Sequence, residues 1–178
     1  FQRTETSSIA CSGCNKNYET DKQSLNILAL QILQESKTPS VIDLLNDYLN
    51  QETLKDETIP EEKKIRDYRY DCDVCKGKYN ATKKQSFTQP PILVIQLKRF
   101  TNSGTKITTP VTISPAFTYS LNDQQKTYRL HSIVYHNGST LYVGHYTAAV
   151  KSADDWYFFD DAHAGQKMDI SNLETVGG

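Results

Sequence analysis

A histidine at position 145 lies between a glycine and a tyrosine, and Asp160 ends an aromatic run fifteen residues later. Residues 147–150 and 156–159 are apolar, which predicts two buried strands. The polar stretch between them is short enough for a hairpin, so His145 and Asp160 would lie near the same end of two paired strands. A carboxylate beside an imidazole fixes its tautomer and stabilises its charged form. The pattern predicts a general base with its orienting acid. The alternative is a hairpin with one core histidine and one surface acid.

Three other histidines compete for this role, but none of them has both an adjoining glycine and an acid placed to meet it. They lie in a predicted strand, at the head of a turn and in a flexible stretch: His131, His136 and His163. The chain has no Gly-x-Ser-x-Gly nucleophile elbow. The residues alone therefore predict a base and its orienter without an attacking group.

All four cysteines fall in two Cys-x-x-Cys pairs, Cys11 with Cys14 and Cys72 with Cys75. Two such pairs predict a four-thiolate zinc site, which implies a reducing, intracellular setting. The alternatives are two disulfides or free thiols, although a disulfide within Cys-x-x-Cys is usually a redox device. The first pair superficially resembles the nucleophile region of papain-like proteases, but a zinc-bound thiolate is a poor nucleophile. A folded segment is expected in the 57 residues between Cys14 and Cys72.

The 178 residues suffice for one good-sized domain, or for a domain with a large insertion. Their 20 Lys and Arg residues nearly balance 21 Asp and Glu residues, so the charge does not suggest an electrostatic nucleic-acid binder. No run of 18 apolar residues exists, so no membrane span is expected. The chain lacks an apolar signal region and an initial methionine, which suggests a fragment. Its 11 tyrosines and frequent Val, Ile and Thr predict more strand than helix.

The first half of the chain is predicted to be strands that lead into and out of the two cysteine pairs. These strands cover residues 2–9, 16–20, 68–71 and 78–85. The clearest helix carries apolar residues from 41 to 49, with Thr38 as the capping hydroxyl and Pro39 at the first helical position. Charged residues 51–64 predict a solvated loop.

The second half is predicted to form a sheet. Residues 92–100 read as a central strand buried on both faces for most of its length. Residues 110–113 predict a short edge strand, because prolines limit its pairing. Residues 128–135 predict another strand, followed by a turn at 136–139 and a strand through 141–143 into His145.

The ordered set of motifs resembles the ubiquitin-specific proteases, which are papain-like deubiquitinating cysteine proteases. The matching segments are the two Cys-x-x-Cys pairs and residues 40–45, 52–54, 91–100, 128–130, 136–138, 144–146 and 156–161. The resemblance implies an α+β fold, with a papain-like palm of mostly antiparallel sheet over residues 90–178. Residues 1–89 would form zinc-ribbon fingers with an intervening packing helix.

The resemblance also implies roles for individual residues. His145 would be the general base, Asp160 the third member of the triad and Asp161 a second, assisting acid. Gly144 and Tyr146 would shape a narrow channel for the Gly-Gly tail of ubiquitin. The four cysteines would hold a structural zinc ion.

The implied activity is hydrolysis of peptide or isopeptide bonds at the C-terminus of ubiquitin. The partners would be ubiquitin and ubiquitinated proteins, in the cytoplasm or the nucleus, without nucleic acid or membrane. The family's cysteine box and its oxyanion donors lie before the fingers, and this chain begins after them, so the chain is expected to be inactive by itself. The alternatives are a catalytically dead ubiquitin-binding module and a zinc-ribbon scaffold for another protein.

Overall fold

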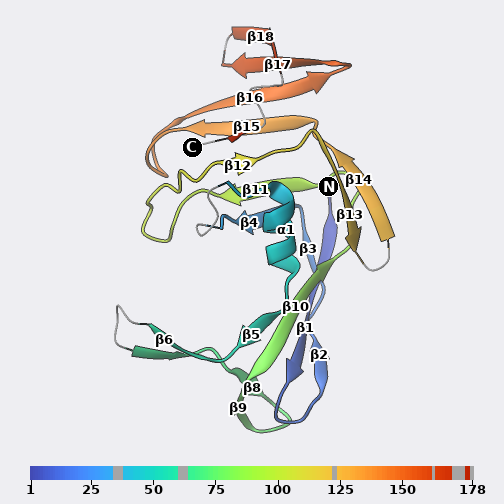
Figure 1. Ribbon diagram of the computed structural model, residues 1–178, viewed down its shortest axis with the longest axis vertical. Coiled ribbons are helices and arrows are strands. Elements are labelled where there is room, and N and C mark those ends of the chain that lie inside the picture. Colours follow the sequence, from blue (N-terminus) through green and yellow to red (C-terminus); the bar gives the residue numbers. More distant parts are fainter. Residues whose placement is uncertain (34–37, 60–63, 122–123, 162, 170–174, 177–178) are drawn as a thin grey trace. The chain divides into compact units, whose positions relative to one another are not determined.

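A computed structural model describes residues 1–33, 38–59, 64–121, 124–161, 163–169 and 175–176 (Figure 1). In this part of the chain, strands far outnumber the single helix, as the composition predicted, and most strand pairs are antiparallel. The chain divides into two compact units, Phe1–Asn26 with Asp47–Pro91 and Ile27–Asn46 with Ile92–Gly178. The units differ from the predicted division at residues 89 and 90 mainly in residues 27–46, which group with the second unit.

The first unit contains a sheet built on two long antiparallel strands, β1 and β10, with Cys11 paired to Ala81 where the strands approach the cysteines. Two short strands pair with β1 and one with β10, and two further hairpins complete the unit. The strands are β1 (Arg3–Cys11), β2 (Asn17–Glu19), β3 (Gln23–Leu25), β5 (Glu52–Leu54), β6 (Asp56–Ile59), β7 (Lys64–Asp67), β8 (Tyr70–Cys72), β9 (Gly77–Tyr79) and β10 (Ala81–Phe87).

The predicted solvated loop at 51–64 is wrong where the structure describes it. Residues 52–54 pair with β10, and β6 forms a hairpin with β7, while residues 60–63 lie outside the described residues. Backbone pairing gives these charged segments their strand structure, and side-chain charge alone does not oppose it.

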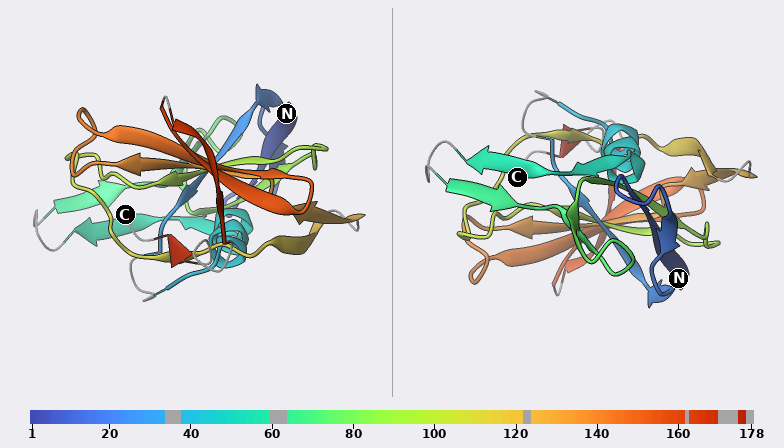
Figure 2. Two further views of the ribbon diagram at one scale, coloured as in Figure 1. Left: turned by 90° about the horizontal axis from the view of Figure 1, so that it is seen from above. Right: turned by 90° about the horizontal axis from the view of Figure 1, so that it is seen from below.

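The second unit contains a parallel pair, β4 with β11, and a four-stranded antiparallel sheet in the order β15-β16-β17-β18. Figure 2 shows in its left view how these four strands cross one another, as expected from the right-handed twist of neighbouring strands. The strands are β4 (Ile27–Gln31), β11 (Val94–Lys98), β12 (Val111–Thr112), β13 (Ala116–Leu121), β14 (Gln124–Arg129), β15 (Ser132–Asn137), β16 (His145–Ser152), β17 (Asp155–Asp160), β18 (His163–Met168) and β19 (Thr175–Val176).

The helix α1 (Val41–Leu49) has the bounds that its apolar periodicity predicted, but its cap differs from the prediction. Ser40 is the N-cap, and its hydroxyl accepts a hydrogen bond from the Asp43 amide at 3.2 Å. The Asp43 carboxylate in turn accepts a hydrogen bond from the Ser40 amide at 2.8 Å. The hydrogen bonds from Ser40 hold the pKa of Asp43 below its usual value. This reciprocal capping box places Pro39 before the cap instead of inside the helix.

Three predictions for the second half need correction. The predicted strand 128–135 is two strands, because the amide of Leu130 donates to Pro115 and the carbonyl of His131 accepts from Lys151. Residues 141–143 form bends, so β16 begins only at His145. The strand β11 pairs with β4 alone among the described strands and is only partly buried.

The core of the four-stranded sheet lies on one face, where Ala149 is fully buried and Trp156 is 4% exposed. Because side chains alternate along a strand, this face of β16 and β17 also carries His145 and Asp160 at one end of the sheet. The packed strands therefore position both candidate site residues. The only helix in the described residues is too short to cross a membrane.

Candidate active site and thiol centre

The candidate base and acid lie on neighbouring antiparallel strands, His145 at the start of β16 and Asp160 at the end of β17. The Nε2 atom of His145 is 2.5 Å from Oδ1 of Asp160, which confirms the predicted proximity. This hydrogen bond and the charge of Asp160 raise the pKa of His145 above its ordinary value of 6.5, with a smaller contribution from Asp161. The two side chains are 47% and 44% exposed, so a substrate can reach them.

The other ring nitrogen of His145, Nδ1, faces a different group. Asp161 has a left-handed backbone (φ 45°), and its Oδ2 atom is 3.8 Å from Nδ1. Since Asp160 accepts the proton on Nε2, Nδ1 is the nitrogen left to take up a proton from another group. Behind the pair, the Asn137 amide donates to the hydroxyl of buried Thr147 at 3.2 Å and joins β15 to β16.

Two glycines border this site in close contact with the backbone and with His136. A Cβ atom on Gly144 would lie 2.1 Å from Nε2 of His136, and one on Gly138 would lie 2.5 Å from the Val143 carbonyl oxygen. The Tyr146 ring packs against His136 with a centroid distance of 4.9 Å, while 64% of Tyr146 remains exposed. Gly144 and Tyr146 thus adjoin His145 on an accessible surface.

The four cysteine sulfurs gather in the first unit, as predicted, and all four lie within 4.8 Å of one another. Two separations, Cys11 to Cys75 and Cys14 to Cys72, are 3.9 Å, and none of the cysteines forms a disulfide. A tetrahedral zinc ion with Zn–S bonds of about 2.3 Å requires sulfur–sulfur distances of about 3.8 Å. The cluster therefore has the donor set and the spacing to hold one such metal ion.

The two Cys-x-x-Cys turns have the same backbone geometry. Asn15 and Lys76, each directly after the second cysteine of its pair, have positive φ angles of 55° and 54°. Their amides donate to the carbonyls of Cys11 and Cys72 at 2.9 and 2.8 Å. The two turns lie side by side, because their four sulfurs are within 4.8 Å of one another. Each turn supplies half of the thiol set.

Hydrogen-bond donors surround the sulfurs. The amides of Cys75 and Val74 and the Tyr18 hydroxyl donate to Cys72 and lower the pKa of its thiol to about 6. The Tyr18 oxygen lies 3.3 Å from the sulfur of Cys14 and 3.5 Å from that of Cys72. Burial and the neighbouring thiols raise the pKa of Cys75 to about 12. Deprotonation of four close thiols is unfavourable because the thiolates repel one another. A bound cation would offset this repulsion.

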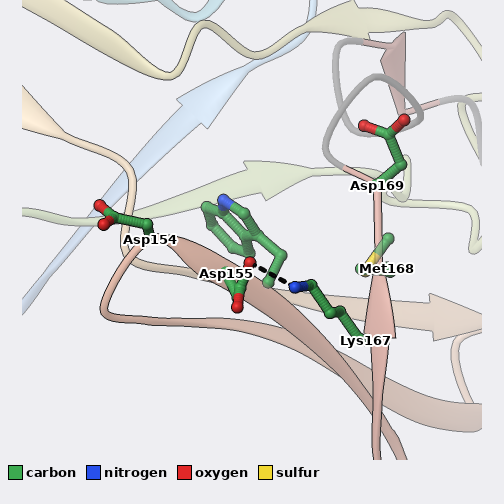
Figure 3. A pocket seen from close by; sticks show the side chains of 6 residues that line it. Asp154, Asp155, Lys167, Met168 and Asp169 are labelled. Carbon is green, nitrogen blue, oxygen red and sulfur yellow. Dashed lines mark ion pairs between the residues drawn. The ribbon is translucent and has the colours of Figure 1, made fainter.

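Two hollows lie along the four-stranded sheet. The larger is at the start of β17, between acidic residues and an ion pair of 2.9 Å from Lys167 to Asp155 (Figure 3). The smaller is lined by Phe158, Asp160, His163 and Gln166. Of the two, only the smaller includes a candidate site residue.

One unit carries the paired His145 and Asp160 on a mostly antiparallel sheet, and the other carries four clustered cysteines that could form a zinc ribbon. The profile of the family described as ubiquitin carboxyl-terminal hydrolase matches residues 1–173. The chain belongs to this family, and within it to the ubiquitin-specific proteases.

Curated relatives and solved structures agree with this membership. Ubiquitin carboxyl-terminal hydrolase 36 of Drosophila ananassae is 37% identical over 167 residues, covering 88% of this chain and 14% of the relative. The same protein of Drosophila erecta is 39% identical over 134 residues, 68% of this chain and 12% of the relative. The chain thus spans about an eighth of the length of these relatives.

Two solved structures of the SAGA deubiquitinating module match the fold. A structure of the yeast module with a mutant Sgf73 has a TM-score of 0.78 at 26% identity, covering 98% of this chain and 38% of the solved one. A structure of Ubp8, Sgf11, Sus1 and Sgf73 bound to monoubiquitin has a TM-score of 0.76, with the same identity and coverage.

Sequence reasoning found the pair and the thiol set but missed three residues around them. Tyr18 was not distinguished from the other tyrosines, although it follows Cys14 by only four residues. His136 lies in the predicted turn and in the matching segment 136–138, but the sequence predicted no role for its ring at the site. No sequence pattern indicated a role for Lys106, because its contacts with residues 136 and 138 span about thirty positions of the sequence.

Proposed function

We propose that this chain is the His–Asp half of a thiol protease site that cleaves bonds at the C-terminus of ubiquitin. The contact that carries the proposal is the 2.5 Å hydrogen bond from His145 to Asp160, in a chain of this family. Because all four cysteines gather in the thiol cluster, the nucleophilic cysteine comes from another part of the full-length protein, and this chain alone is inactive.

In the proposed reaction, Nδ1 of His145 takes the proton from the nucleophilic thiol. The thiolate attacks the carbonyl carbon of the terminal glycine of ubiquitin, and the resulting imidazolium gives its proton to the leaving amine as the C–N bond breaks. His145 then takes a proton from water, whose oxygen attacks the thioester and releases the thiol. Asp160 holds the ring through Nε2 and stabilises the imidazolium formed in each step.

Asp161, Gly144 and Tyr146 have supporting roles in this proposal. The Asp161 carboxylate lies near Nδ1 and adds to the stabilisation of the imidazolium. Gly144, where the His136 ring leaves no room for a side chain, and the exposed Tyr146 ring would border the channel for a Gly-Gly tail.

The thiol cluster would hold a structural zinc ion through Cys11, Cys14, Cys72 and Cys75. Bound zinc supplies cross-linking of the two Cys-x-x-Cys turns and takes no part in catalysis. Ubiquitin and ubiquitinated proteins are the proposed partners, and one supporting observation is that a matching structure contains monoubiquitin. The proposed location is the cytoplasm or nucleus, and the four free thiols support it because disulfides are rare in those compartments.

The test is cleavage of a fluorogenic ubiquitin substrate by the full-length protein. His145→Ala should lower kcat/KM at least about 100-fold, because general-base catalysis contributes that much. His131→Ala, which removes an exposed histidine outside the site, should leave the rate unchanged. A near-normal rate for His145→Ala would reject the assignment. Ubiquitin binding without cleavage by the wild-type protein would favour the dead binding module.

A further inference from the structure

The loop that precedes His145 leaves and rejoins the sheet at a narrow point, which we call the neck. The neck consists of Lys106, His136, Gly138 and Gly144. In the neck, Gly138 and Gly144 approach so closely that a Cβ atom on Gly138 would lie 2.8 Å from the Gly144 Cα. His145 follows directly as the first residue of β16. The neck therefore determines where the catalytic strand begins.

The His136 ring forms one wall of the neck. It packs edge-on against Phe100 with a centroid distance of 5.8 Å and at a tilt against Tyr146 with a centroid distance of 4.9 Å. It also leaves Gly144 no room for a side chain. The Nδ1 atom of His136 is buried and has no hydrogen-bond partner in the described part of the chain. A buried, unpaired nitrogen costs stability, so stability alone would favour an apolar residue here.

Lys106 holds the neck from the other side. Its ammonium donates to the carbonyl of Gly138 at 2.7 Å and to that of His136 at 3.3 Å. One cation thus joins the end of β15 to the first residue of the loop. Charge-assisted hydrogen bonds of this kind are about twice as strong as neutral ones.

We propose that His136 and Lys106 are positioning residues for His145. The His136 ring and the Lys106 ammonium fix the Gly144 backbone, and this backbone aligns the His145 imidazole with Asp160. The inference rests on the proposed function, because it explains how the base is held. Displacement of a catalytic group by about 1 Å can cost about 100-fold in rate.

The first test measures alignment without catalysis. In NMR spectra of the 178-residue chain, the Nε2 proton of His145, hydrogen-bonded to Asp160 with an Nε2–Oδ1 distance of 2.5 Å, should give a downfield resonance. His136→Ala should abolish or shift this resonance, and His131→Ala should leave it in place. Lys106→Met should weaken it, with Lys98→Met as the charge-matched control on β11. An unchanged resonance in both neck variants would overturn the proposal.

The second test is a double-mutant cycle between His136 and Gly144. Gly144→Ala places a methyl group against the ring, so it should disturb the His145 resonance strongly in the wild-type background. In the His136→Ala background, the added methyl group has space and should cause a much smaller further change. Equal effects in both backgrounds would show that the ring does not act through Gly144.

The third test separates positioning from the proposed function in the full-length protein. His136→Ala should lower kcat about 10-fold and change KM for the ubiquitin substrate less than about twofold, because only alignment is lost. His136→Gln, which keeps side-chain bulk beside Gly144, should restore part of the rate. If the wild-type protein does not cleave the ubiquitin substrate, the proposed function is wrong. The His145 resonance would still show whether His136 and Lys106 position the His145 ring. A fall in folded protein without any change in kcat or in the resonance would assign His136 a structural role only.

Discussion

Removal of the proposed zinc ion is expected to unfold the first unit and leave the second unit folded. The buried hydrophobic residues described in the first unit are few, and two of them are metal-site cysteines: Cys11, Leu49, Cys72, Ala81 and Phe87. The apparent binding free energy of a structural zinc ion is about 10–16 kcal/mol. This is comparable with the whole stability of a domain, about 5–15 kcal/mol. A unit with so small a core should therefore not remain folded after the metal leaves.

The assay is hydrogen exchange followed by mass spectrometry, before and after a zinc chelator. Amides of β1 and β10 should lose their protection, and amides of β16 and β17 should keep it, because their core contains Ala149 and Trp156 instead of thiols. Elemental analysis should find one zinc per chain before chelation. Cys72→Ser should reproduce the loss without any chelator, and serine at an exposed site such as Lys84 should not.

Continued protection of β1 and β10 in protein shown to be free of metal would refute this reasoning. Two disulfides in the isolated protein would also refute it, because a cross-link within each Cys-x-x-Cys pair leaves no thiolates for a metal.

Three shorter predictions concern single contacts. Tyr18→Phe removes the hydroxyl that contacts two sulfurs and should weaken zinc binding about 10-fold in a chelator competition; equal affinity would exclude that contact. Asp160→Asn should lower the pKa of His145 toward 6.5 in an NMR titration. The contact stabilises the fold below pH 6.5 and this stabilisation is lost as pH rises through the raised pKa, so a variant with unchanged pH-dependent stability would contradict the assignment. Ser40→Ala removes the helix cap and should cost about 1 kcal/mol in denaturant unfolding, with no cost expected if the box were only a surface contact.

The cysteine cluster could be predicted because its information is local. A Cys-x-x-Cys turn needs only four residues, and four thiols in one chain have few ways to be satisfied other than by one another. His145 and Asp160 could likewise be paired in advance, because a short hairpin joins their strands and its alternation places both side chains on one face.

The missed features depend on contacts that are distant in sequence. The parallel pairing of β4 with β11 joins residues 67 positions apart, such as Ile27 and Val94, and no periodicity reports it. Lys106 is an ordinary surface lysine in the sequence and becomes a backbone clamp only when β15 arrives beside it. The charged residues at 51–64 predict a loop, but the segment pairs with β10 and within a hairpin. Composition does not indicate which backbone segment will pair with another.

The two matching Cys-x-x-Cys turns have a consequence for synthesis of the protein. Cys14 leaves the ribosome 58 residues before Cys72. At about 5–20 residues per second, the first two thiols wait roughly 3–12 seconds for the second pair. During that interval a nascent chain has only two of the four proposed zinc ligands. Oxidation of these two thiols, or disulfide formation with another thiol, therefore competes with correct assembly. Zinc shortage in a cell would therefore be expected to prevent newly made molecules from folding before it affects molecules that are already assembled.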